Sequence, residues 1–321
     1  MRASSAIAAL LLSACSVGVS GVAGQATFFD ARGGALPSAG PGELGPIALG
    51  ADVVLEVRDL GGGSAQVSVD GPAFTVTDVE PRAGALTVGL RATAVGHAML
   101  HVERELSDSL GLECAPIARI ELAPSEAVAA GGPPDTFAAL LDARGTAMVK
   151  LVATRLAPDS RILFGGPVLQ WAAAGGNALV DGAASMLDAA ETGQLLLTGG
   201  RASVTASAGS STASVQIVGV APSELTAIVA TPSAATSEHG HGGGYDLRIG
   251  EQAYLDAQVF AGPLPVLGGD AALSASLAPS GFAVATLSDG RVSLQALAAG
   301  EATLTLTAGA ATVAIPVRVT R

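Results

Sequence analysis

The chain has 321 residues and a net charge of −12, and only 14% of its residues are charged and 3% aromatic. Such an acidic chain lacks the basic surface that phosphate backbones require, which excludes a nucleic-acid-binding protein. A hydrophobic content of 49% excludes an intrinsically disordered chain. At roughly 100–200 residues per domain, the length predicts two or three domains.

The amino terminus has the layout of a secretory signal. Arg2 is followed by a short apolar run over residues 6–12 and then by small residues. The run is shorter than the roughly 20 residues that a membrane-spanning helix needs, and no later apolar stretch reaches that length.

The four residues Leu-Ser-Ala-Cys that end at Cys15 resemble a bacterial lipobox. The resemblance implies that the signal peptide, residues 1–14, is removed and that Cys15 then carries a thioether-linked diacylglycerol and an amino-terminal acyl chain such as palmitate. More than one acyl chain anchors a protein stably. Ser16 after the cysteine implies sorting to the outer membrane, so we expect an exported, lipid-anchored protein of the cell envelope.

Ordinary cleavage further on, after Ala23 or Ala26, is the alternative, and it would discard Cys15. Residues 15–25 are small and predict a flexible tether between the lipid and the first domain. Because the lipobox uses one of the two cysteines, Cys114 has no partner in the chain. Two readings of Cys114 stay open: a buried small apolar residue, or an exposed thiol that forms an intermolecular bridge.

A repeat of about 100 residues is the most informative pattern in the sequence. Gly-x-Ala-x-apolar segments begin at Gly96, Gly200 and Gly300. A second set of glycine-led apolar segments precedes them, at Gly50, Gly145 and Gly250. A unit of this length is too long for a solenoid repeat and fits an independent β-sandwich domain.

The local pattern is that of β-strands. Apolar residues alternate with polar ones over 302–307 and 313–319, which is the period of a strand. Pro316 cannot donate to a ladder, so we expect the last strand to be an edge strand or bulged. Residues 137–156 fit helical spacing in part, but Gly145 interrupts it and favours strands. Residues 183–192 are compatible with a short helical crossover.

The units resemble the bacterial immunoglobulin-like domains of invasin- and intimin-type surface proteins. The resemblance rests on the Ile-x-Leu-x-Pro segment that ends at Pro124, on the central glycine-led strand and on the closing Gly-x-Ala hairpin. Trp171 stands where this family often has a Trp-led strand, and the other two copies lack it. The implied fold is all-β, with three tandem immunoglobulin-like sandwich domains over residues 26–115, 116–221 and 222–321. Domains of this family serve as spacers, stalks and adhesive modules.

Few residues have the spacing of a chemical site. His239 and His241, next to Glu238, are weak candidates for a metal site in a glycine-rich loop, and a solvated loop is the competing reading. His97 and His101 lie on a predicted strand with both side chains toward solvent. Trp171 is either a core residue or an exposed sugar-binding ring, and the sandwich pattern favours the core.

An acidic cluster lies near the predicted boundary at residue 115. It consists of Glu103, Glu105, Asp108 and Glu113. A calcium site between domains is one reading, but no Asp-x-Asp-x-Asp spacing occurs and Arg104 lies within the cluster. We therefore expect a solvated charged linker.

The sequence contains no P-loop, no Gly-x-Ser-x-Gly and no His-Glu-x-x-His motif. We therefore expect a non-catalytic envelope lipoprotein without a cofactor. Its tandem domains would act as a structural spacer or as an adhesion module that binds an envelope or extracellular protein or a matrix component. The alternative is a metal- or glycan-binding envelope protein that uses the loop around His239 and His241.

Overall fold

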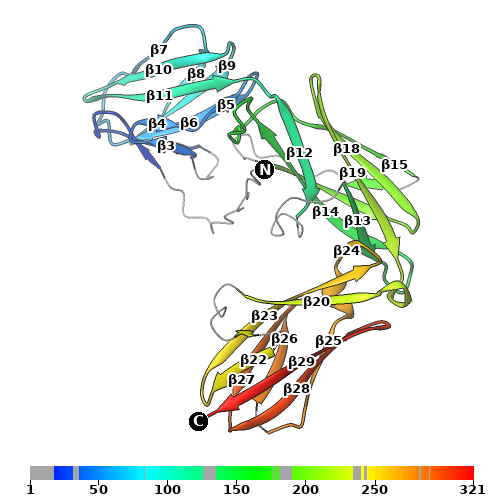
Figure 1. Ribbon diagram of the computed structural model, residues 1–321. Helices are drawn as coiled ribbons and strands as arrows, with labels where there is room; N and C mark the ends of the chain where they lie inside the picture. Colours follow the sequence, from blue (N-terminus) through cyan, green and yellow to red (C-terminus); the bar gives the residue numbers. More distant parts are fainter. Residues whose placement is uncertain are drawn as a thin grey trace.

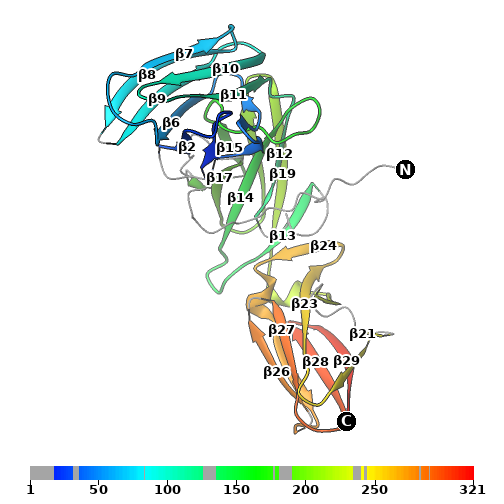
Figure 2. The same ribbon diagram turned by 90° about the vertical axis from the view of Figure 1, so that its left-hand side faces the viewer.

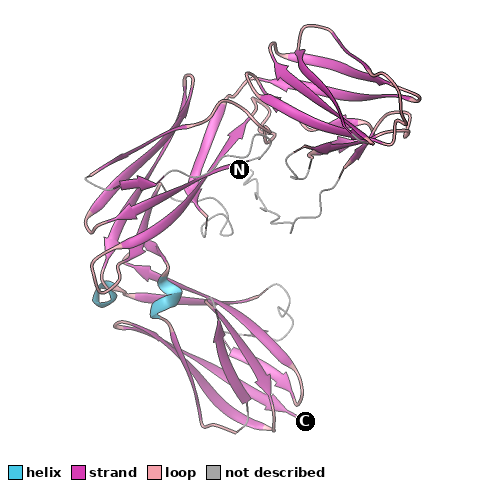
Figure 3. Ribbon diagram, turned by 180° about the vertical axis from the view of Figure 1, so that it is seen from behind, coloured by secondary structure: helices cyan, strands magenta, loops and turns pink. Residues whose placement is uncertain are grey.

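The computed structural model describes residues 18–31, 36–82, 84–125, 135–175, 178–180, 190–233, 240–241, 244–281, 283–288 and 290–321. The regular secondary structure of these residues is almost entirely β-strand (Figure 3). The helical elements among them are two short 3-10 turns, η2 (Pro222–Glu224) and η4 (Gly269–Ala272). The predicted all-β class is therefore confirmed. In the described part of the chain, no helix is both long and apolar enough to cross a membrane.

The first repeat unit consists of two facing sheets. One sheet has the strand order β1 (Val19–Ser20), β2 (Thr27–Asp30), β6 (Asp52–Arg58), β9 (Ala85–Ala92), β8 (Phe74–Arg82). The other has the order β3 (Ser38–Gly40), β4 (Glu43–Leu44), β11 (Ser107–Ala115), β10 (Gly96–Glu103), β7 (Gln66–Asp70), and β5 (Ile47–Ala48) also pairs with β11.

The second unit repeats this plan. One sheet has the order β12 (Arg119–Pro124), β14 (Ala147–Leu156), β17 (Ala190–Leu197), β16 (Ala178–Val180). The facing strands are β15 (Gln170–Ala174), β18 (Arg201–Ala208), β19 (Ser211–Val220), β13 (Thr136–Leu140).

The third unit has the same plan of two facing sets of strands. One set of strands is β20 (Ala227–Pro232), β23 (Gln252–Ala261), β27 (Arg291–Ala296), β26 (Ala283–Ser288). The facing sheet has the order β21 (Gly240–His241), β22 (Gly244–Arg248), β29 (Ala311–Thr320), β28 (Gly300–Ala308), β25 (Ser274–Ala278). One additional strand, β24 (Leu264–Leu267), forms a hairpin with β23.

The common strand order is that of an immunoglobulin-like sandwich, with an A-B-E-D sheet facing a C-F-G sheet. The B strands are β6, β14 and β23, the C strands are β7, β15 and β25, and the G strands are β11, β19 and β29. In each unit a short A′ strand crosses to the second sheet and pairs in parallel with the G strand. These A′ strands are β5, β13 and β22.

Alternating side chains explain why each unit closes around its own core. In β6 the side chains of Val53, Leu55 and Val57 are buried, whereas Asp52 and Arg58 are exposed. Successive side chains of a strand point to opposite faces, so the apolar set meets the facing sheet. Three large clusters of buried apolar residues result, one formed mainly by each unit.

The glycines that revealed the repeat are required by the backbone. Gly50, Gly145 and Gly250 each lie two residues before a B strand and have φ values of 86°, 75° and 89°. Only glycine adopts this left-handed region without strain. The spacing of these glycines therefore marks the same turn in each unit.

The strand interpretation of residues 137–156 is confirmed, because they form β13, a turn and β14. The Asp142 carboxylate accepts hydrogen bonds from the backbone N–H groups of Arg144 and Thr146, and it closes the turn that ends at Gly145. Residues 190–192 of the suggested helical crossover belong instead to β17. The rest of that crossover lies outside the described residues.

The expectation of an edge strand is wrong for β29 as a whole but agrees with the position of Pro316 itself. The strand β29 lies between β28 and β22, and its ladder with β28 runs through Pro316 without a register shift. The ladder with β22 begins at the next residue, Val317. The missing N–H of Pro316 therefore falls just outside that ladder, which is why the strand tolerates it.

The prediction of a flexible tether over residues 15–25 is wrong in part. Residues 1–17, which include Cys15, lie outside the described residues, but Val19 and Ser20 pair with Phe28 and Thr27. The segment from residue 18 onward is therefore attached to the first unit. The boundaries at residues 115 and 221 stay predictions, and one sheet continues across the second of them through β13 and β24.

Candidate functional site: the joints between units

The first joint is a backbone contact between the A′ strand of the first unit and the B–C loop of the second. The Ala48 N–H donates to the Phe164 carbonyl at 2.9 Å, and the Phe164 N–H donates to the Pro46 carbonyl at 3.0 Å. Ile47 and Phe164 thus form a parallel bridge. The pairing is that of a short parallel strand addition, in which sheet hydrogen bonds connect two units.

A small apolar cluster surrounds this bridge. Ala48 and Ala115 from the first unit pack with Ala157 and Leu163 from the second, and all four are buried. Leu163 has no solvent exposure. Burying a side chain of this size contributes about 1.5–3 kcal/mol, so Leu163 stabilises the joint.

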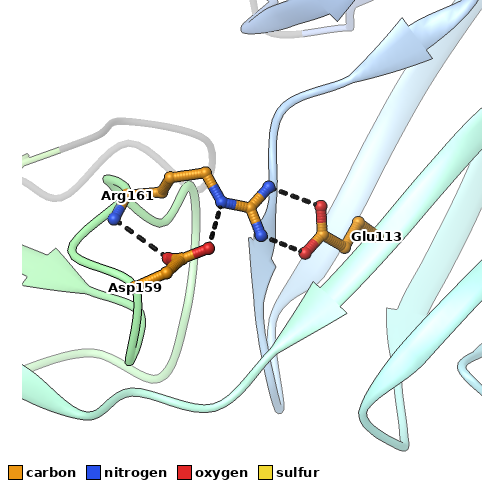
Figure 4. Close-up of polar contacts among 3 residues, drawn as sticks. All are labelled: Glu113, Asp159 and Arg161. Carbon is orange, nitrogen blue, oxygen red and sulfur yellow. Dashed lines mark hydrogen bonds and ion pairs between the residues drawn. The ribbon is translucent and has the colours of Figure 1, made fainter.

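An ion-pair group connects the two units at this joint, with Arg161 between Asp159 and Glu113 (Figure 4). The Arg161 guanidinium donates to both carboxylate oxygens of Glu113, at 2.7 and 2.5 Å. Its Nε donates to Asp159 at 2.6 Å, which fixes the direction of the arginine side chain. These hydrogen bonds from Arg161 lower the pKa of Glu113. Because the guanidinium is half exposed, such a pair contributes only about 0.5–1 kcal/mol.

A buried network holds the B–C loop of the second unit. Arg155 and Glu191 are 4% and 3% exposed, and the guanidinium donates to the carboxylate at 2.6 Å. Arg155 also donates to the Pro167 carbonyl at 3.0 Å. Glu191 further accepts hydrogen bonds from the Leu169 N–H and the Trp171 indole, each at 3.0 Å. The loop that carries Phe164 is thus fastened to the second unit by side chains of the B, C and E strands.

The second joint has the same construction. The B–C loop of the third unit contains β24, which pairs in parallel with the A′ strand β13 through Ala138–Val266 and Ala139–Leu267 (Figure 1). The side chain of Leu267 belongs to the core of the second unit, and Ala138 belongs to the core of the third. Figure 2 shows β24 beside β13, at the point where the two units meet.

The joints also leave a signal in the sequence, which lies outside the glycine-led segments of the repeat. The two B–C loops read Leu163-Phe164-Gly165-Gly166 and Val266-Leu267-Gly268-Gly269. Phe164 and Leu267 occupy the same place, because they lie opposite Ile47 and Ala139, which have matching positions on the A′ strands, and each precedes two glycines. In the first unit the loop after β6 has Leu60 followed by glycines, without the preceding apolar residue.

The amino-terminal segment is fastened by Asp108. Its buried carboxylate accepts hydrogen bonds from the backbone N–H groups of Ala23, Gln25 and Ala26, at 2.7–2.8 Å. Burial raises the pKa of Asp108, but these bonds and one from the Ser109 N–H outweigh it, so that the net pKa is lowered. A side chain on Gly21 would collide with this carboxylate. Asp108 therefore ties residues 21–26 to the G strand.

The acidic cluster is thus not a solvated linker. Asp108 holds the amino-terminal segment, and Glu113 forms part of the first joint. Glu103 and Glu105 are exposed on the β10–β11 hairpin. The described residues contain no group of three or more histidine, cysteine or acidic side chains that would hold a metal ion.

The other candidate residues from the sequence are Cys114, Trp171, His97 and His101. Cys114 is buried, which agrees with the apolar reading, and burial raises the pKa of its thiol to about 11. Trp171 is half-buried against the second core. His97 and His101 are exposed, as expected, and His101 contacts Asp70 at 2.9 Å.

The proposed metal loop is outside what the structure describes. Glu238 and His239 lie outside the described residues. His241 belongs to β21, but the structure does not describe its side chain. The metal alternative therefore stays a prediction.

Comparisons with known proteins give structural similarity alone. No family model and no curated protein matches the chain. The Escherichia coli adhesin FdeC matches with 11% identity and a TM-score of 0.26, over 86% of this chain and 94% of that one. Invasin, a bacterial integrin-binding protein, matches with 13% identity and a TM-score of 0.28, over 94% of this chain and 60% of that one.

Domains 4 and 5 of the S-layer protein SbsC match with 19% identity and a TM-score of 0.24, over 39% of this chain and 67% of that one. Similarity at this level carries no argument about activity or partners. The immunoglobulin-like fold assigned to this chain rests on its own strand order.

Proposed function

We propose that this chain is a non-catalytic spacer of the cell surface, in which tandem immunoglobulin-like sandwiches are held in fixed order by paired joints. The observation that carries the proposal is that the same joint is built twice. In both places a B–C loop adds to the A′ edge of the preceding unit. A spacer needs this property, because connections through single linker residues leave neighbouring units free to reorient.

The proposal includes the anchor and the role of the exposed faces. A lipid on Cys15 would attach the spacer to the outer membrane. The hydrogen bonds that Asp108 accepts from the Ala23, Gln25 and Ala26 N–H groups, here called the Asp108 clamp, support this arrangement. They fasten residues 21–26, near the start of the described chain, to the first unit. The exposed faces of the units would then contact an envelope or extracellular protein or a matrix component.

The spacer role is tested by measuring the distance between the first and third units. We would label Thr75→Cys and Ser276→Cys, which are exposed on β8 and β25, in a Cys15→Ala chain and record single-molecule energy transfer. One narrow distance distribution is expected. Phe164→Asp, which disrupts the first joint, should broaden it, and the exposed control Val168→Asp should not. A broad distribution in the parent chain would contradict the proposal.

The anchor is tested separately. Growth with a clickable fatty acid should label the parent protein and leave the Cys15→Ala variant unlabelled. Equal labelling of both would show that the acyl chain is elsewhere or absent, and would remove the anchor from the proposal without affecting the joints.

A further inference from the structure

The first unit holds the chain in place from residue 18 onward. Val19 is 4% exposed and belongs to the first core, and its strand β1 pairs with β2. A side chain on Gly18 would collide with Thr27 and with the ring of Phe29, so the backbone of residue 18 lies directly on β2. Together with the Asp108 clamp, these contacts fix the start of the described chain on the outer face of the A-B-E-D sheet.

This attachment leaves a lipid on Cys15 little freedom. Cys15 and Gly18 are separated by three Cα–Cα steps. For any arrangement of residues 16 and 17, the two Cα atoms lie within about 11 Å of each other, because an extended chain spans at most about 3.6 Å per residue. A bilayer that holds the lipid of Cys15 therefore begins close to Gly18 and to the part of β2 beneath it.

An arginine lies beside this point with donors to spare. The Arg58 guanidinium stacks on the Phe29 ring, with its Cζ 4.4 Å from the ring centroid, and its Nε donates to the Glu56 carboxylate. Gly18 and Arg58 thus lie against the same aromatic ring. Among the described residues, no acceptor contacts the two terminal nitrogens of Arg58, and its side chain is 49% exposed.

A guanidinium held in this way is oriented for a phosphate. Its planar fork can donate parallel N–H bonds to two phosphate oxygens, and the Phe29 ring and the Glu56 bond fix its direction beforehand. Because Glu56 balances the charge of Arg58, a single phosphate ion from solution gains little here. A bilayer attached nearby presents phosphates at a high effective concentration, which favours lipid headgroups as the ligand.

We propose that the face around Phe29 and Arg58 rests on a phospholipid surface, where Arg58 donates to lipid phosphates. The inference rests on the lipid anchor of the proposed function and adds which side of the first unit the membrane contacts. That side is the outer face of β2 and β6. The spacer would then leave the membrane from a unit that lies on the surface.

The test uses the lipidated full chain in vesicles of phosphatidylethanolamine and phosphatidylglycerol. A fluorophore is attached at Ser20→Cys on β1 or, as the matched control, at Ser68→Cys on β7 of the facing sheet, and both positions are exposed. Cys114 is buried and should stay unlabelled. Lipids that carry a nitroxide on the headgroup should quench the probe at residue 20 and leave the probe at residue 68 unquenched.

A longer tether separates the contact of Arg58 from proximity alone. An insert of about 10 Gly and Ser residues after Ser16 behaves as a flexible coil and allows the unit to leave the surface. In this lengthened chain the quenching at residue 20 should depend on Arg58. A single arginine near an anionic surface favours the bound state about fivefold, so Arg58→Gln should lower the quenching by about that factor. Arg91→Gln, at an exposed ion pair on the same sheet, should leave it unchanged.

Three results would overturn the proposal: equal quenching at residues 20 and 68 in the parent chain, equal quenching in the lengthened chain with and without Arg58→Gln, or unchanged quenching in vesicles of a phosphate-free galactolipid. Flotation with the vesicles reports on the anchor in the same samples. A chain that does not float contradicts the anchor of the proposed function, whereas a floating chain with equal quenching contradicts the surface contact alone.

Discussion

Phe164 of the second unit forms a parallel β-bridge with Ile47 of the first, although 117 residues separate them in the chain. Next to the bridge, the buried side chain of Leu163 packs between the units. Two sheet hydrogen bonds and one apolar contact therefore connect the units at the same point, and their contributions can be separated by substitution.

Leu163→Ala should loosen the first joint without unfolding either unit. Removing a buried leucine side chain costs about 2–5 kcal/mol, and here the cost falls on the contact between the units. Hydrogen exchange should show faster exchange at the Ala48 amide and unchanged exchange at core amides such as Leu55. Unchanged protection of Ala48 would show that the backbone bridge alone maintains the joint.

Glu113→Gln should weaken the first joint slightly and in a salt-dependent manner. An ion pair with a half-exposed arginine contributes about 0.5–1 kcal/mol, and salt screens it. A double-mutant cycle with Arg161→Met, followed by exchange at the Ala48 amide, should give a coupling energy in this range at low salt. The exposed pair of Arg119 and Glu121 is the matched control. A coupling equal to that of the control would contradict the role of Glu113 in the joint.

Asp108→Asn should release the amino-terminal segment. Hydrogen bonds to a charged acceptor contribute about 1.5–3 kcal/mol, and the amide oxygen of asparagine replaces them only in part. The amides of Ala23, Gln25 and Ala26 should lose exchange protection, while those of β6 keep theirs. Gly21→Ala should have the same effect, because a methyl group there meets the Asp108 carboxylate.

The clamp at Asp108 should also depend on pH. The pKa of Asp108 is lowered in the folded chain, so its contribution to stability is complete above the pKa of an unfolded aspartate. It is lost as the pH falls through the lowered pKa of the folded state. Stability measured from neutral to strongly acidic pH should therefore fall less steeply in Asp108→Asn than in the parent. Parallel curves would contradict the assignment.

Glu191→Gln should strongly destabilise the second unit. It leaves the buried Arg155 guanidinium without a counter-charge, which costs about 3–5 kcal/mol. The double variant Arg155→Met with Glu191→Gln should recover part of this loss, because no buried charge remains. Denaturant unfolding of the full chain is the measurement, and Glu121→Gln, at an exposed pair, should change stability by less than about 1 kcal/mol.

Cys114 should resist thiol reagents in the folded protein. Its thiol is buried, and burial first and then the Glu113 charge raise its pKa to about 11, so little thiolate forms at pH 8. A Cys15→Ala chain should react with iodoacetamide in denaturant and hardly at all without it. Rapid reaction of the native chain would indicate that Cys114 is an exposed thiol.

The repeat and the strands were predictable because they follow from local chemistry. Gly50, Gly145 and Gly250 are fixed by a left-handed turn that only glycine adopts freely, so their spacing is visible in the sequence. Alternation of apolar and polar residues likewise predicts strands wherever one face of a sheet is buried. Among the described residues Pro316 has a ladder on one side alone, but the sequence does not show that β22 pairs with the residues that follow it.

The acidic residues show what local chemistry could not decide. In the sequence, Glu103, Glu105, Asp108 and Glu113 form one charged group, and nothing distinguishes their roles. In the structure, Asp108 faces the amino-terminal segment and Glu113 faces Arg161, which lies 48 residues further along the chain. These roles differ because each side chain meets a different segment, and which segment approaches it is decided by the fold and not by the local sequence.

By itself, the acidic, aromatic-poor sequence determined an all-β chain with a repeat of about 100 residues, because turns and strand alternation are local properties. The tertiary structure decided how the units meet. A joint requires that an A′ edge of one unit and a B–C loop of the next come within hydrogen-bonding distance. That condition depends on how both sandwiches close, and it leaves only a short apolar-Gly-Gly trace in the sequence.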